Sequence, residues 1–220
     1  MMEILWENIA VLAGALFGFL YGAPRYLQAR KPLYASMIVL GTGCTVLGRL
    51  YQCVRVLTGY PLTGRFQVGV LGVLGTFAFF FSSNYGQIDS LVDDGGDAFR
   101  RYRMIAWTGP ALIAVLYLPT AFGPQTAAEK AVGAIVAFVI AAACYYHVKH
   151  LFIPDVDYGV VKCLRRFNAL AILYGILCML EMTALAYQST MLLIAAGGLM
   201  TLVIAVIVPV MDKGVRAWRT

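Results

Sequence analysis

Charged side chains are scarce in this sequence. Only 13% of the 220 residues are Asp, Glu, Lys or Arg, about half the share of a soluble domain. Hydrophobic residues make up 61% and the mean hydropathy is +0.78, against about 45–50% apolar residues in soluble domains. These values exclude a soluble globular chain and predict a single polytopic membrane domain over residues 1–220, surrounded by the lipid bilayer.

Several catalytic and chromophore motifs are also missing. The sequence has no GxSxG, no Walker loop and no HExxH, the motifs of serine hydrolases, P-loop proteins and zinc proteases. Lys213 lies beyond the last apolar segment, so no lysine is placed for a retinal Schiff base. The acidic run that starts at Asp93 lacks the downstream GxxxDxxxD pattern of the CDP-alcohol phosphotransferases. We therefore expect no enzyme, no cofactor or metal site, and no nucleic-acid partner.

Cysteine usage predicts reduced thiols. The five cysteines occur singly, in odd number and without a CxxC pair, so we expect buried free thiols rather than a disulfide framework. They are Cys44, Cys53, Cys144, Cys163 and Cys178. At the amino end, Glu3 and Glu7 stand before the first apolar segment where a signal peptide would carry Lys or Arg, and no small-residue cleavage site follows. A cleaved signal peptide is not expected.

Seven apolar stretches have the length of a membrane-spanning helix, which is about 20 residues. The sequence therefore predicts an all-α bundle of seven transmembrane helices. We place them at about 5–23, 33–57, 66–85, 104–122, 131–147, 163–187 and 191–211.

The distribution of Lys and Arg predicts the orientation. Thirteen of the 17 basic residues lie in the linkers after segments 1, 3 and 5 and in the carboxyl-terminal tail. Because basic residues accumulate on the cytoplasmic side, the N-terminus is predicted outside and the C-terminus inside. The localisation expected from this topology is multi-pass, and compactness favours a bacterial inner membrane. The segments also divide as three, one and three, which would make any internal repeat parallel and set the second segment against the sixth.

Polar residues inside the second segment mark a candidate ligand-binding site. Arg49, Gln52 and Arg55 recur every third residue and share one side of a helix. A guanidinium in hydrocarbon costs at least about 2.5 kcal/mol and needs a partner or water. Glu181 in the sixth segment is the expected partner, at a depth between Gln52 and Arg55. Tyr51 and Tyr174 are expected to help line the site.

Two other polar groups are predicted at the cytoplasmic side. The first is a loop for docking a protein partner, with Asp97 and its neighbours capping a short amphipathic helix that runs through Arg103. Its residues are Asp93, Asp94, Asp97, Arg100, Arg101 and Arg103. The second is the histidine pair His147 and His150 at the end of the fifth segment, expected to be interfacial and solvated.

These patterns support two functional hypotheses. In the first, the protein binds or transports a small polar or anionic solute, held by the arginines and Gln52, with Glu181 setting their charge state. In the second, it is a non-catalytic signalling or accessory subunit in which the buried pair locks two helices together and the cytoplasmic loops contact a partner. Whether the polar cluster faces a cavity or is sealed by packing separates the two hypotheses.

Overall fold

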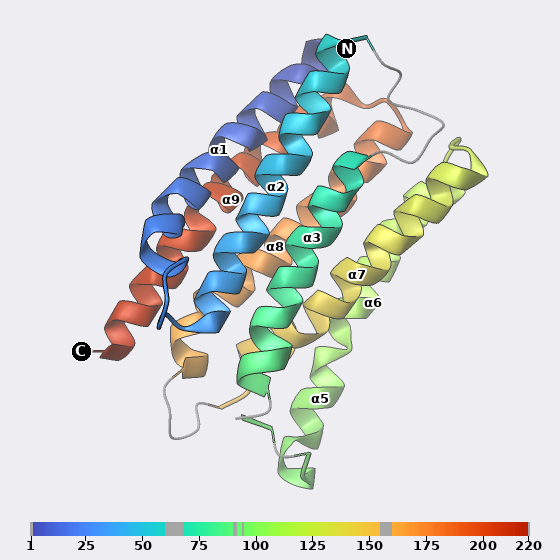
Figure 1. Ribbon diagram of the computed structural model, residues 1–220. Helices are drawn as coiled ribbons and strands as arrows, with labels where there is room; N and C mark the ends of the chain where they lie inside the picture. Colours follow the sequence, from blue (N-terminus) through green and yellow to red (C-terminus); the bar gives the residue numbers. More distant parts are fainter. Residues whose placement is uncertain (1, 60–67, 90–91, 94, 155–159, 220) are drawn as a thin grey trace.

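The computed structural model describes residues 2–59, 68–89, 92–93, 95–154 and 160–219. Within these ranges all regular structure is helical, and it includes six segments long and apolar enough to cross a membrane and one shorter apolar helix, α3. The prediction of an all-α seven-helix membrane protein is confirmed (Figure 1). In chain order the elements are α1 (Met2–Tyr26), α2 (Leu33–Leu57), α3 (Val68–Asn84), the π-helical turn η1 (Tyr85–Asp89), the 3-10 turn η2 (Asp97–Phe99), α5 (Arg100–Ala106), α6 (Thr108–Phe122), α7 (Ala127–Phe152), α8 (Val160–Ala186) and α9 (Thr190–Arg219).

Six of the helices form a closed ring. Going round it, α1 packs on α2, α2 on α3, α3 on α7, α7 on α8, α8 on α9, and α9 on α1. The fourth span, made of η2, α5 and α6, lies outside the ring, where α6 contacts α7 and α8. In this order α2 and α8 stand on opposite sides of the ring, so contacts between them must be made by long side chains across its interior.

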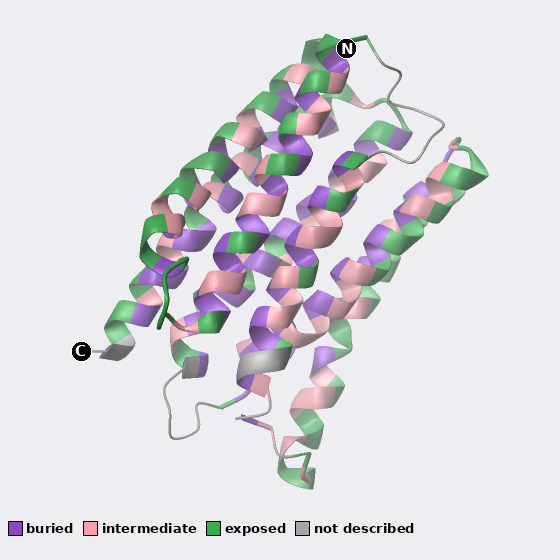
Figure 2. Cartoon of the chain, viewed as in Figure 1, coloured by how far each residue is buried: buried purple, intermediate pink, exposed green. Residues whose placement is uncertain are grey.

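The outer surface of the ring is apolar. Large hydrophobic side chains on several helices are half exposed or more, among them Leu47, Phe138 and Leu202, while the buried residues lie on the sides that face neighbouring helices (Figure 2). An apolar exterior of this extent is the surface that a membrane protein presents to lipid chains.

Local sequence signals explain where the helices begin, end and break. Thr126 and Glu129 form a capping box that starts α7 four residues before the predicted boundary. Pro154 follows the last residue of that helix and its C-cap. Pro110 has no N–H to donate to the carbonyl four residues earlier, which accounts for the break between α5 and α6. The start of the predicted 66–85 segment lies outside the described residues.

Glycines bring α2 and α3 into close contact. A Cβ added at Gly72 would lie 2.5 Å from the Cα of Gly48, and one added at Gly48 would lie 2.9 Å from the carbonyl oxygen of Gly69. Such backbone approach is possible only without side chains at these positions. Because Gly48 faces α3, the next residue, Arg49, points into the ring.

Candidate functional site

Arg49 is the centre of a buried ionic cluster. Its Nη1 donates to Oε1 of Glu181 at 2.7 Å and its Nη2 to Oε2 at 2.6 Å, a two-point pair across the ring from α2 to α8. Both residues are less than one-tenth exposed. The predicted partner is therefore the observed one, and Glu181 contacts Arg49, the deepest of the three polar residues. The long arginine side chain lets the guanidinium reach a carboxylate on the opposite helix.

Two further partners come from α1. Nη1 of Arg49 also donates to Glu7, at 3.1 Å and 3.3 Å from its two carboxylate oxygens, and to Oδ1 of Asn8 at 3.0 Å. The amide of Asn8 in turn donates to the carbonyl of Ile4 at 2.8 Å. One guanidinium thus faces two carboxylates and one amide oxygen.

Sequence reasoning missed Glu7 because it was grouped with Glu3 as preceding the first segment, although the predicted bounds of 5–23 already include position 7. That assignment was wrong: α1 begins at Met2, so Glu7 lies more than one turn inside the helix and is 6% exposed. Space for it comes from α9, where a Cβ at Gly197 would lie 2.4 Å from Cγ of Glu7. A Glu within a segment of spanning length was the signal that could have identified it.

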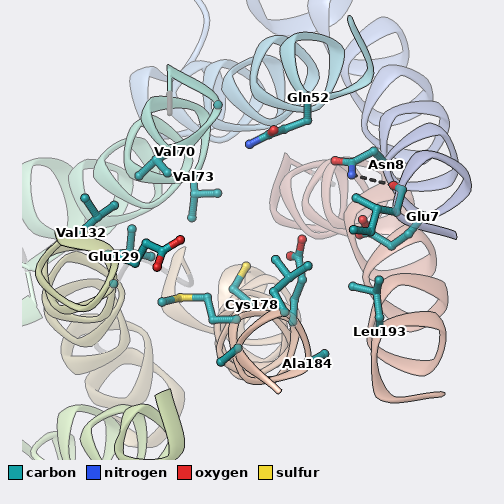
Figure 3. A pocket seen from close by; sticks show the side chains of 18 of the residues that line it. Glu7, Asn8, Gln52, Val70, Val73, Glu129, Val132, Cys178, Ala184 and Leu193 are labelled. Atoms are coloured by element: carbon teal, nitrogen blue, oxygen red, sulfur yellow. Dashed lines mark hydrogen bonds between the residues drawn. The ribbon is translucent and has the colours of Figure 1, made fainter. Parts of the chain in front are cut away.

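A cavity of about 830 Å³ lies beside this cluster, inside the ring. Glu7 and Asn8 of α1, Gln52 of α2 and Cys178 of α8 border the same space (Figure 3). The lining also includes exposed residues at the N-terminal end of the bundle, such as Glu3, Pro124 and Gln188. Its volume is that of ordinary small-molecule sites, which span about 300–1,000 Å³.

The predicted site residues divide into two groups. Arg49, Gln52, Tyr174 and Glu181 all line the cavity. Tyr51 and Arg55 are not among the lining residues; the guanidinium of Arg55 instead lies 6.0 Å from the ring centre of Tyr51.

A layer of aromatic side chains lies between the cavity and the C-terminal half of the ring. Tyr174 is buried and stacks on Phe77, with ring centres 5.8 Å apart. Phe80 meets Phe77 edge to face at 6.0 Å and Phe167 at 5.5 Å. These four fully buried rings fill the interior between the cavity and the C-terminal half of the ring.

A second polar cluster begins on the other side of that layer. His147 of α7 packs edge-on against Phe80 and Phe167. Its Nδ1 lies 2.7 Å from Nδ2 of Asn84 and 2.9 Å from Oδ1 of Asn168. The two asparagines are 2.9 Å apart, nitrogen to oxygen, so the three side chains form a closed triangle.

The chain of contacts continues toward the C-terminal end of the bundle. His150 lies between Oδ1 of Asn84 at 3.0 Å and Oδ1 of Asp89 at 2.9 Å. Lys149 bridges Asp89 and Asp93, with 2.6 Å to each carboxylate. The expectation of solvated histidines is wrong: His147 is 0% and His150 1% exposed. The predicted fifth segment ended at His147, whereas α7 continues to Phe152 and carries both rings into the interior.

The two aspartates are held ionised. Burial alone would raise the pKa of Asp89, but hydrogen bonds from His150 and Lys149 outweigh it and the pKa lies below its ordinary value. Burial also opposes ionisation of Asp93, and there Lys149, the backbone N–H of Gly95 and the nearby Arg103 lower the pKa.

The predicted docking loop is only partly at the surface. Asp93 pairs with Arg103 at 2.7 Å and with Lys149, so its carboxylate is taken up by contacts within the protein. Asp97, Arg100 and Arg101 are exposed, whereas Asp94 lies outside the described residues. Among the described residues no side chain caps η2 or α5, so the expected capping by Asp97 is not observed.

A third cluster joins α1 to α9. Asp212 accepts hydrogen bonds from the hydroxyls of Tyr21 at 2.7 Å and Tyr26 at 2.6 Å, and Arg216 pairs with it from the next turn of α9. The predicted last segment stopped at Met211, one residue too early to include it. Among the residues that the structure describes, no three His, Cys, Asp or Glu side chains are grouped to hold a metal ion.

No family model, curated protein sequence or solved structure matches this chain. The apolar spans establish an integral, multi-pass membrane protein. Its function is inferred from the geometry of the two interior clusters and the cavity.

Proposed function

We propose that the protein is a non-enzymatic membrane carrier that binds a small polar cation in the cavity beside Arg49. The observation that supports this proposal is the cavity itself: ionic residues that would cost several kcal/mol in hydrocarbon border a space of about 830 Å³. A structural ion pair needs tight packing around it, whereas a binding site needs adjacent space.

The charges of the cluster favour a cation over the anion anticipated from the sequence. Both terminal nitrogens of Arg49 already donate to carboxylates of the protein, so an anion would have to displace them. Two carboxylates share this one guanidinium, which leaves a surplus negative charge when both are ionised. A buried surplus charge is costly until a proton or another cation neutralises it.

Glu7 is the carboxylate that we expect to meet the ligand. Glu181 holds two short bonds from both terminal nitrogens, whereas Glu7 shares a single nitrogen at 3.1 Å and 3.3 Å. The more weakly bound carboxylate is the one that a proton or a ligand ammonium group can engage without breaking the stronger pair. Binding should therefore weaken as the pH falls, because protons compete for Glu7.

The arrangement along the ring supports transport. The cavity lining reaches exposed residues at the N-terminal end of the bundle, and the aromatic layer of Tyr174, Phe77, Phe80 and Phe167 separates it from the C-terminal half. A site inside the bundle, reached from one side and closed toward the other, is the arrangement that alternating-access carriers require.

Binding is tested with detergent-purified protein and chloride salts of methylammonium, guanidinium and choline, with sodium acetate and phosphate as anion probes. At least one cation should raise the unfolding temperature of the wild type, because a ligand that prefers the folded state stabilises it. Glu7→Gln should abolish that rise, while Asp97→Asn, which removes an exposed carboxylate, should keep it. A shift by the anions alone, or an equal shift in Glu7→Gln, would contradict the proposed site.

Transport is tested separately in proteoliposomes, with the radiolabelled form of whichever probe binds. Uptake by the wild type and its loss in Glu7→Gln are expected. Binding without uptake would favour the second hypothesis, a ligand-sensing or accessory subunit, in which the exposed Arg100 and Arg101 contact a protein partner.

A further inference from the structure

His150 occupies a position that neutral imidazole cannot satisfy as the amides stand. Its Nδ1 faces Oδ1 of Asn84 at 3.0 Å and its Nε2 faces Oδ1 of Asp89 at 2.9 Å. Both partners are oxygens that accept, so both ring nitrogens must donate. An imidazole donates from both nitrogens only when it is protonated.

A second hydrogen-bond arrangement suits the neutral ring. Turning the amide of Asn84 places its Nδ2 against Nδ1 of His150, which then accepts, while Nε2–H still donates to Asp89. Turning Asn168 as well lets its Nδ2 donate to the oxygen of Asn84. Amide nitrogen and oxygen have nearly the same shape, so these turns require no change in packing.

His147 distinguishes the two arrangements. In the first, Nδ2 of Asn84 lies 2.7 Å from Nδ1 of His147, the shortest contact of the triangle, and an amide nitrogen can only donate. Two donors at 2.7 Å would repel more than two acceptors at 2.9 Å. Nδ1 of His147 therefore accepts from Asn84, faces Oδ1 of Asn168 without a hydrogen bond, and leaves the proton of its neutral ring on Nε2. In the second arrangement the oxygen of Asn84 takes that place, so Nδ1 carries the proton and donates.

Two buried atoms of the first arrangement have no hydrogen-bond partner among the residues that the structure describes. They are Nε2 of His147 and Nδ2 of Asn168, and both residues are 0% exposed. A buried polar atom without a partner costs about 1–3 kcal/mol. Turning Asn168 gives its nitrogen a partner but puts its oxygen in the unpartnered place. Moving the proton to Nδ1 likewise replaces an unpaired N–H on Nε2 of His147 by an unpaired lone pair. Both arrangements therefore leave two buried atoms unpartnered, and the protonation state of His150 decides between them.

We propose that His150 is a proton-binding site, and that its protonation state sets the hydrogen-bond direction through Asn84 and Asn168 and hence the tautomer of His147. The proton enters from the C-terminal end of the bundle, where Asp89 is the most exposed member of the cluster. Protonation of His150 thereby changes the hydrogen bonds of His147, whose ring packs against the aromatic layer.

The fixed charges around His150 balance one another. From η1 and the turn after it, Asp89 and Asp93 face the site; from α7 itself, Lys149 pairs with both. Arg103 of α5 neutralises Asp93 further out, so these four groups sum to zero and His150 adds the variable charge. The other ionisable groups nearby are His147 and Tyr146 of α7, and Arg165 of α8, which donates to the carbonyl of Ile153.

The test is ¹⁵N NMR of histidine-labelled, full-length protein in lipid bilayers from about pH 5 to about pH 8, the range in which imidazole normally changes charge. The chain has two histidines, so either His147→Gln or His150→Gln assigns both signals. At low pH, His150 should show two protonated nitrogens and His147 a proton on Nε2. At high pH, His150 should keep only the Nε2 proton while His147 carries its proton on Nδ1, and both changes should share one midpoint.

The His150→Gln variant tests the coupling between the charge of His150 and the tautomer of His147. In His150→Gln, which keeps a polar side chain but cannot titrate, the tautomer of His147 should be the same at every pH. The proposal is overturned if His150 keeps one protonation state throughout, or if His147 keeps one tautomer while His150 titrates. None of these readouts depends on the solute proposed for the cavity. The proton-binding proposal and the carrier proposal can therefore be refuted separately.

Discussion

The unequal roles of the two glutamates around Arg49 give the sharpest prediction. Glu181→Gln removes the two-point pair at 2.6 Å and 2.7 Å and leaves a buried guanidinium held by the longer contacts to Glu7. Removing one partner of a buried ion pair costs about 3–5 kcal/mol. Glu7→Gln leaves that pair intact, and the amide has the shape of the protonated acid, so its cost should stay below about 1 kcal/mol.

The difference should be visible in thermal unfolding of detergent-purified protein. For a chain of this size 1 kcal/mol corresponds to about 2–4 °C, so Glu181→Gln should unfold roughly 6 °C or more below the wild type. Glu7→Gln should unfold within about 4 °C of it. Equal destabilisation by the two variants would refute the argument, because it would mean that both carboxylates are needed to hold Arg49 and that neither is free for a ligand.

Three further predictions concern packing, charge and orientation. Gly72→Ala should destabilise by about 1–3 kcal/mol because its Cβ would meet the backbone of α2, whereas Gly198→Ala, with nothing within 4 Å, should be neutral or stabilising in the same unfolding assay. Asp93 is ionised in the folded protein and its pKa is lowered, so it adds stability at pH values above 3.8, the ordinary pKa of an aspartate. This stability is lost as the pH falls through the lowered pKa. Asp93→Asn should therefore lose about 2 kcal/mol of unfolding free energy at pH 7, and its stability should fall less steeply in acid than that of the wild type. If the charge rule holds, an impermeant maleimide should label Gln188→Cys on intact cells and Lys213→Cys only after the membrane is opened; the reverse pattern would invert the topology.

The sequence determined the features that depend on local composition. The number of spans and their helical character follow from apolar length, because every backbone polar group in a bilayer must be satisfied within its own segment. The bounds of α2 were predicted at 33–57 and are observed at Leu33–Leu57. The pairing of Arg49 with Glu181 was also predicted, since a charge buried in hydrocarbon requires a partner and few candidates exist.

Tertiary structure alone decided which side chains meet. The place of Glu7 depends on how α1 is rotated against α9 and on the room left by Gly197, neither of which is written in the periodicity of one helix. The burial of His147 and His150 depends on α7 lying between α3 and α8, whose asparagines supply their partners. Hydropathy records how apolar a segment is, whereas the hydrogen bonds of a buried polar residue come from helices distant in the chain.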